Sequence, residues 1–128
     1  MIVREFEAWL ADVLAAQPWV RQVSRWSVDG GPKPVGVTLN GSISMQLVGG
    51  DQKAPPLNPS DAGIPVAVAA PDASPAGWAD SIAAAIEAAG LARASEVETY
   101  ARWGGSTKPG GVRVVFGDGS EVFGSLLT

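Results

Sequence analysis

The apolar positions near the amino terminus recur three and four residues apart, which is the pattern of an amphipathic helix with one buried face. These positions are Phe6, Trp9, Leu10, Val13 and Leu14. We therefore predict a helix over residues 3–16, ended by Pro18, which cannot continue it. Residues 19–28 are rich in β-branched and aromatic side chains, and we predict a strand there.

Residues 35–47 alternate between apolar side chains and polar or small ones, with an Asn-Gly pair near the centre. Period-two alternation around a turn sequence predicts a β-hairpin with one apolar face. A two-residue turn would pair apolar positions with polar ones. A three-residue loop at 39–41 instead pairs Val37 with Ile43 and keeps one face apolar, so we prefer this register. One long uninterrupted strand is the alternative.

The middle of the chain is rich in proline. Residues 49–75 contain six of the ten prolines, so we predict a linker or surface loop, with a short edge strand at 64–68. Ser74 followed by Pro75 is typical of a helix start. The apolar positions that follow predict a helix that ends near Gly90.

The last third of the chain predicts a second hairpin. Its strands are expected at 112–116 and 121–126, around a Gly-Asp-Gly turn, and the same register argument pairs Val114 with Val122. Residues 95–103 fit two structures, because a capping-box pattern favours a helix while alternating residues favour a strand. The sequence leaves this choice open.

The two halves of the chain resemble each other at a constant spacing. The positions Val20, Arg25, Trp26, Pro32, Val35 and Val37 recur as Val97, Arg102, Trp103, Pro109, Val112 and Val114. This similarity predicts an internal repeat within one domain over 1–128, with units at 1–48 and 74–128 and a proline-rich linker at 49–73. The alternative is two unrelated hairpins that each follow a helix. In both cases we predict an α+β fold, with two helices packed on antiparallel β-hairpins of about six strands.

Composition and charge exclude several classes of protein. The chain has 128 residues, a net charge of −4 and neither Cys nor His. It therefore lacks disulfides, Cys/His zinc ligands and the Ser-His and Cys-His catalytic pairs. No spacing singles out a pair of carboxylates for acid–base catalysis, and the Gly-Gly segments lack a phosphate-binding motif. We predict that the protein is not an enzyme and has no cofactor and no metal site.

The amino-terminal residues carry charges where a signal peptide has an apolar run. No apolar stretch reaches the about 20 residues that span a bilayer. We expect a soluble protein of the cytoplasm, or of a particle assembled there, with no membrane partner.

Two Arg-Trp pairs, Arg25–Trp26 and Arg102–Trp103, are the most distinctive candidates for a binding site. Arg and Trp dominate the energetics of protein interfaces, so one hypothesis is that both pairs face a partner. The other is that both Trp rings lie in the core under the helices while both Arg side chains are solvated, since neighbouring residues of a strand face opposite ways. The second hypothesis is the simpler one, and we prefer it.

The last hairpin supplies a second set of candidates. Val115 and Phe123 are expected on the face opposite the longer apolar row, next to Arg113, either as cross-strand neighbours or, in a shifted register, as a diagonal pair. An exposed Val–Phe pair with a polar rim is typical of a protein interface. The alternative is that the linker at 49–75 folds back over this face and buries it.

These features predict a non-catalytic protein that binds other protein chains, as a homo-oligomer or as an adaptor or structural component of a larger assembly. A particle encoded by a phage or another mobile element is the kind of assembly that we consider. The alternative is a module that binds single-stranded nucleic acid through the Arg-Trp strands, because residues 20–48 and 99–128 are mildly basic. Nucleic acid is the less favoured partner, since the chain as a whole is acidic.

Overall fold

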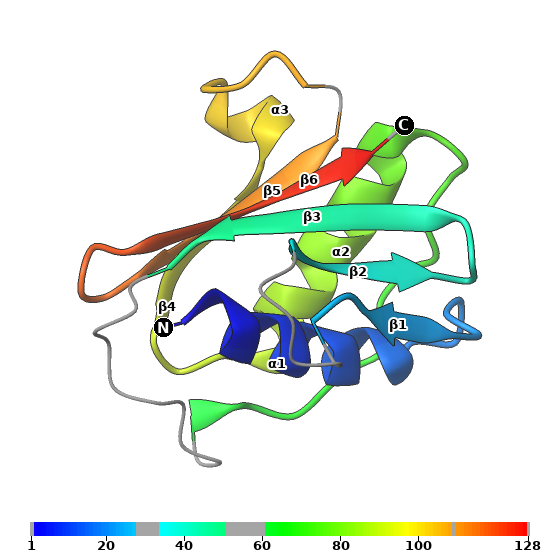
Figure 1. Ribbon diagram of the computed structural model, residues 1–128, viewed down its shortest axis with the longest axis horizontal. Coiled ribbons are helices and arrows are strands. Elements are labelled where there is room, and N and C mark those ends of the chain that lie inside the picture. Colours follow the sequence, from blue (N-terminus) through cyan, green and yellow to red (C-terminus); the bar gives the residue numbers. More distant parts are fainter. Residues whose placement is uncertain (1, 28–33, 51–60, 109, 128) are drawn as a thin grey trace.

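The computed structural model describes residues 2–27, 34–50, 61–108 and 110–127. Along the chain its elements are α1 (Val3–Ala15), β1 (Val23–Arg25), β2 (Val35–Leu39), β3 (Ile43–Gly49), α2 (Pro75–Ala89), β4 (Ala94–Thr99), α3 (Tyr100–Trp103), β5 (Gly111–Phe116) and β6 (Glu121–Leu127). The six strands form one antiparallel sheet in the order β1-β2-β3-β6-β5-β4 (Figure 1). The predicted α+β class is confirmed, and the short helix α3 adds to the two expected helices.

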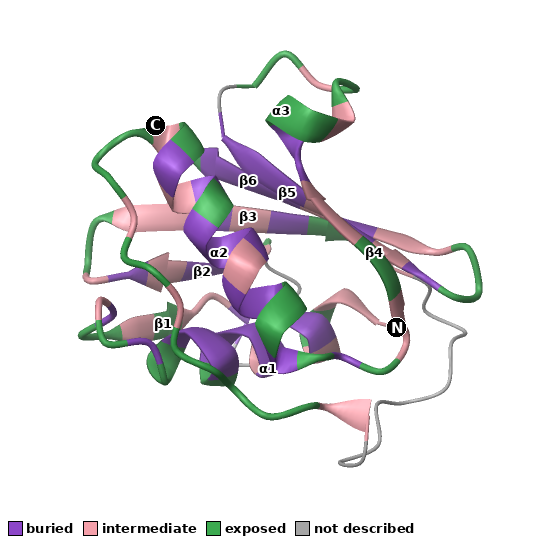
Figure 2. Ribbon diagram, turned by 180° about the vertical axis from the view of Figure 1, so that it is seen from behind, coloured by how far each residue is buried: buried purple, intermediate pink, exposed green. Residues whose placement is uncertain are grey.

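The two long helices lie on one face of the sheet, α1 against β1, β2 and β3 and α2 against β4 and β5 (Figure 2). We call this the inner face, and the opposite one the outer face. The core lies between the inner face and the two helices. Its most completely buried apolar side chains are Phe6, Leu10, Val13, Leu14, Val37, Leu39, Met45, Ile82 and Val114. No helix in the described part of the chain is long and apolar enough to cross a bilayer.

Local sequence sets the boundaries of the long helices. At the start of α2, Ser74 Oγ accepts a hydrogen bond from Gly77 N at 3.0 Å, and Pro75 is the first helical residue. Gly90 follows the last turn with a φ of 74°, a left-handed conformation that glycine adopts without steric cost. Helix α1 ends at Ala15. Both helix predictions are confirmed.

The second hairpin has the predicted register, with Val114 of β5 paired to Val122 of β6. The first hairpin does not. In its ladder Val37 pairs with Met45 rather than with Ile43, so the predicted register is wrong by two residues. The apolar residues still share the inner face, because a shift of two residues preserves which face each side chain occupies.

The turn explains the shift in the first hairpin. Asn40 and Gly41 both have positive φ, and Ser42 N donates a hydrogen bond to Leu39 O at 3.1 Å. Two central residues with positive φ are typical of the tight turn that an Asn-Gly pair favours. The loop is therefore 40–42, and Leu39 pairs with Ile43 at its base.

The predicted strand at 19–28 is too long, since β1 covers only Val23–Arg25. The backbone N–H groups of Arg21 and Gln22 donate instead to the side-chain oxygen of Asn40, at 2.6 and 3.3 Å. Asn40 thereby holds residues 21–22, which lie outside the strand, beside the turn of the first hairpin. Residue 28 lies outside the described residues.

The predicted edge strand at 64–68 is not a strand, because this segment lies along the helices. Gln17 of the α1 carboxyl end bonds with Val66 O and Val68 N, each at 2.9 Å, and Ser81 of α2 donates to Ala69 O. The described part of the linker therefore covers the helices and not the outer face. Residues 51–60 lie outside the described residues.

Residues 95–103 form both of the alternatives that the sequence left open. The chain is a strand as far as Thr99 and a helix from Tyr100. Thr99 Oγ1 accepts a hydrogen bond from Arg102 N at 3.3 Å and so caps the helix that follows the strand.

The order of a helix, a strand and a hairpin occurs twice, and the sheet order is symmetric about the β3–β6 pair. The matches of Val35 with Val112 and of Val37 with Val114 follow this symmetry, but those of the Arg-Trp pairs do not. Trp26 comes directly after β1, whereas the first residue after β4 is Tyr100, and Trp103 ends α3. The internal duplication is not confirmed, and its matched Pro32 and Pro109 lie outside the described residues.

Candidate protein-binding surface

A cluster of aromatic and aliphatic side chains lies on the outer face where β3 and β6 meet α3. The rings of Phe123 and Trp103 have centroids 5.5 Å apart, and the Tyr100 ring lies 6.0 Å from that of Trp103. Val48 pairs with Phe123 across the β3–β6 ladder, and 49% of its surface is exposed. We call Val48, Tyr100, Trp103 and Phe123 the aromatic patch.

Tyr100 fixes α3 on the outer face. A Cβ at Gly111 would lie 2.5 Å from Tyr100 Cζ, so the ring lies directly against the backbone of β5. The Tyr100 hydroxyl and Ser125 Oγ are 2.8 Å apart and form a buried hydrogen bond. The glycine and the hydroxyl pair thus anchor the start of α3, and its last residue, Trp103, is presented beside Phe123.

The aromatic patch borders a hollow of about 280 Å³. The remaining residues that line it are Gly105, Ser106, Lys108 and Ser125. Aromatic and aliphatic surface beside hydroxyl and ammonium groups is suited to an apolar side chain of another molecule with polar neighbours.

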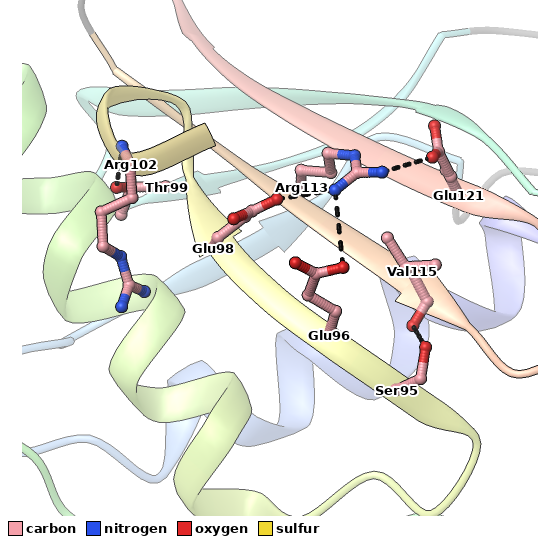
Figure 3. Close-up of polar contacts among 8 residues, drawn as sticks. All are labelled: Ser95, Glu96, Glu98, Thr99, Arg102, Arg113, Val115 and Glu121. Carbon is pink, nitrogen blue, oxygen red and sulfur yellow. Dashed lines mark hydrogen bonds and ion pairs between the residues drawn. The ribbon is translucent and has the colours of Figure 1, made fainter. Parts of the chain in front are cut away.

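Arg113 lies beside the aromatic patch and contacts three carboxylates (Figure 3). Its Nη1 is 2.6 Å from Glu98 Oε1 and 3.8 Å from Glu96 Oε2, and its Nη2 is 2.6 Å from Glu121 Oε1. Its Cζ lies 5.1 Å from the centre of the Trp103 ring, within the range of a cation–π interaction. The guanidinium therefore links β4, β5, β6 and α3.

The Arg113 side chain is only 16% exposed, and its Nε is buried with no hydrogen-bond partner among the described residues. The hydrogen bond to Glu121 raises the pKa of Arg113 against the opposing effect of desolvation, and the bond to Glu98 adds to the rise. One positive charge thus faces three negative ones. Arg113 and the three glutamates together carry a net negative charge next to the aromatic patch, and we call them the acidic border.

Trp26 lies on the outer face at the other end of the sheet. Its Nε1 donates to Thr38 Oγ1 at 2.9 Å, and a Cβ at Gly36 would lie 2.7 Å from Trp26 Cε3. The ring therefore lies against β2 where glycine leaves room, as the Tyr100 ring lies against β5 at Gly111.

Arg25 points to the inner side, where it pairs with Glu7 of α1. The carboxylate of Glu7 is fully buried and accepts four hydrogen bonds. The donors are Arg25 Nε at 3.0 Å, Ser27 Oγ at 2.5 Å, Ser27 N at 3.3 Å and Gly36 N at 2.9 Å. This network fastens α1 to β1 and β2, so its role is structural.

Sequence reasoning missed Glu7, although a signal was present. Glu7 is spaced three and seven residues from Leu10 and Leu14, and so shares their side of the helix. A carboxylate on the buried side of a helix requires a donor from elsewhere in the chain.

The preferred hypothesis for the Arg-Trp pairs is wrong for both Trp residues and for Arg25, and it holds for Arg102, which is exposed. Trp26 and Trp103 are half-buried on the outer face rather than in the core. Arg25 is paired with a buried carboxylate, and Arg102, although exposed, lies 3.6 Å from Glu87. The two pairs lie at opposite ends of the sheet and do not form one site.

Val115 and Phe123 both lie on the outer face, but they are not directly opposite each other across the two strands. Val115 pairs with Glu121 and Phe123 with Arg113, which makes Val115 and Phe123 diagonal neighbours. The Arg113–Glu121 ion pair runs along the other diagonal and separates them. Phe123 contacts Trp103 instead.

The structure brings Trp103, Arg113 and Phe123 together, and it places Arg25, Trp26, Arg102 and Val115 elsewhere. Among the described residues no group of three or more Asp, Glu, His or Cys side chains is arranged to hold a metal ion. No family model, curated protein or solved structure matches the chain.

Proposed function

We propose that the protein is a non-catalytic protein-binding module, which acts as an adaptor or structural component of a larger assembly. Its docking surface is the aromatic patch on the outer face, and its partner is another protein chain. The class of partner follows from the chemistry of the patch, which combines a Trp, a Phe and an exposed Val around one hollow.

The observation that carries the proposal is an uncovered apolar surface on a sheet whose other face already packs on two helices. Val48 is half exposed, and Trp103 and Phe123 are half-buried, in the described structure. Aromatic side chains near an apolar centre contribute most of the energy in many protein interfaces. The acidic border around Arg113 supplies the polar rim that surrounds such centres.

The state of the arginines favours a protein partner over single-stranded nucleic acid. Arg25, Arg102 and Arg113 each lie within 4 Å of at least one carboxylate. A phosphate backbone would have to compete with those carboxylates. It would also meet the acidic border next to Trp103 and Phe123, the side chains on which bases would stack. A protein partner can dock on the aromatic patch without displacing the carboxylates from these arginines.

The proposal is tested by cross-linking followed by binding measurements. A photo-reactive residue at position 48 should cross-link one protein from the cells that produce this chain. The same residue at position 16, which is exposed on the helix side of the sheet, should not. With that partner purified, Phe123→Ser should weaken binding about tenfold or more, as loss of a central aromatic contact does.

Val115→Ser is the matched control, because it makes a similar change on the outer face beyond the Arg113–Glu121 pair. It should change the affinity less than about threefold. Val48→Ser is the second test variant, since its half-exposed side chain contributes little to folding. Wild-type affinity in both Phe123→Ser and Val48→Ser would refute the proposal. Micromolar binding of a single-stranded oligonucleotide at about 50 mM salt, weakened by added salt, would favour the nucleic-acid alternative.

A further inference from the structure

The free edge of β4 combines three features that together define a second binding surface, separate from the aromatic patch. Strand β4 has β5 on one side, and no strand of the described residues lies on its other side. The regular ladder runs from Glu96 to Thr99, after a bulge between Ala94 and Glu96. An unpaired edge presents backbone N–H and C=O groups that an extended chain can bind.

The helix side of this edge holds a hollow of about 290 Å³ between α2 and β4. Its apolar lining consists of Ile86, Leu91, Ala94 and Val97. Because Val97 pairs with the buried Val114, its side chain faces the inner side of the sheet. A residue of an added strand opposite Val97 would therefore point to the same side, next to the hollow.

The outer side of the same edge is acidic. Glu96 and Glu98 alternate with Val97 and so project from the outer face, where both contact Arg113 (Figure 3). With Glu121 they place three carboxylates around one guanidinium, and the Glu96 side chain is 54% exposed. Basic side chains on an added strand would lie beside Glu96 and Glu98 and offset this excess charge.

We propose that the β4 edge binds an extended segment of a partner protein in which basic residues alternate with aliphatic ones. The aliphatic residues point to the hollow lined by Ile86, Leu91 and Val97, and the basic residues face Glu96 and Glu98. Main-chain hydrogen bonds add the segment to the sheet as a seventh strand.

The same charges exclude a second copy of this chain as the occupant. Antiparallel pairing of two β4 edges would bring the Glu96 and Glu98 side chains of both copies onto one face. Like charges directly opposite each other destabilise a strand pair. The carboxylates thus prevent self-pairing and select a basic strand.

The test uses two labelled hexapeptides, one alternating Lys and Val and one alternating Glu and Val, titrated into the full chain by fluorescence anisotropy. The Lys-Val peptide should bind, and the Glu-Val peptide should bind at least about tenfold more weakly, because its charges repel Glu96 and Glu98. Hydrogen exchange should slow at amides within 96–99 when the Lys-Val peptide is bound.

Glu96→Lys should weaken binding of the Lys-Val peptide about fivefold or more and strengthen binding of the Glu-Val peptide. Asp12→Lys is the matched control, because it makes the same charge change at an exposed position of α1 and should change neither affinity. Phe123→Ser should bind the Lys-Val peptide as wild type does, which separates this surface from the aromatic patch.

Several outcomes would overturn the inference. These are equal affinity for the two peptides, wild-type binding of the Lys-Val peptide by Glu96→Lys, and unchanged exchange at 96–99 on binding. Concentration-dependent protection of the same amides without peptide would show that a second copy occupies the edge.

Discussion

The buried carboxylate of Glu7 provides the most direct test of how this fold is held together. Glu7→Gln keeps the size of the side chain but replaces one acceptor oxygen with an NH₂ group. The carbonyl oxygen can still accept from two donors on one side of the group. On the other side, the NH₂ group would face further donors, because all four partners of Glu7 are donors.

The size of the effect follows from these contacts. If the amide oxygen takes the place of Oε1, Ser27 N and Gly36 N lose their acceptor inside the protein. Each buried donor left unsatisfied costs about 1–3 kcal/mol, and the bonds to Arg25 and Ser27 Oγ also lose the charge that strengthens them. We expect Glu7→Gln to lower the free energy of unfolding by about 3–5 kcal/mol, which matches the loss of one partner of a buried ion pair.

Urea unfolding monitored by circular dichroism measures this change. We expect the midpoint to fall while the m-value stays the same. Asp12→Asn is the matched control, since it removes the same charge from an exposed position of the same helix. The control should stay within about 0.5 kcal/mol of wild type. A loss below about 1 kcal/mol in Glu7→Gln would refute the view that the four donors depend on this carboxylate.

Two further predictions concern a strand and a turn. Gly36→Ala should lower the free energy of unfolding by about 1–3 kcal/mol, because its Cβ would crowd the Met45 carbonyl and the Trp26 ring. Gly117→Ala, whose Cβ would have its closest contact at 3.9 Å, should be nearly neutral in the same urea experiment. In an NMR titration, Asp118 should show a pKa below its usual value, because its carboxylate accepts hydrogen bonds from the Ser120 hydroxyl and N–H. The stability from this pair should be complete above the usual pKa of Asp and lost as pH falls through the lowered value, and an unshifted pKa would contradict it.

Features with local causes could be predicted from the sequence. The start of α2 depends on Ser74 and Pro75, and its end depends on Gly90, all within a few residues of the helix. The register of the second hairpin also followed from its turn and its apolar row. In the first hairpin, two registers that differ by two residues keep the same face apolar, so hydrophobic pattern alone could not separate them. The positive φ of Asn40 and Gly41 decides between them.

The candidate site was harder to predict because its geometry depends on contacts between distant segments. Tyr100 decides whether Trp103 lies in the core or on the outer face. The Tyr100 ring packs on the backbone at Gly111, where a larger residue would clash, and its hydroxyl forms a hydrogen bond with Ser125. No local pattern around Trp103 contains that information. Arg113 was recognised as a rim residue, but its three carboxylates come from two other strands.

The placement of the aromatic residues explains why the exposed apolar surface lies where it does. A glycine within a strand leaves backbone uncovered, and an aromatic ring packed over it restores the lost contact. Trp26 covers β2 at Gly36 and Tyr100 covers β5 at Gly111, on either side of the central strands. In the described part of the chain, the β3–β6 pair has Trp103 as its aromatic neighbour at Phe123, where the two rings are tilted, and Val48 stays half exposed. Because the neighbouring strands already have their own aromatic cover, a partner that docks on the outer face gains most apolar contact at this central pair.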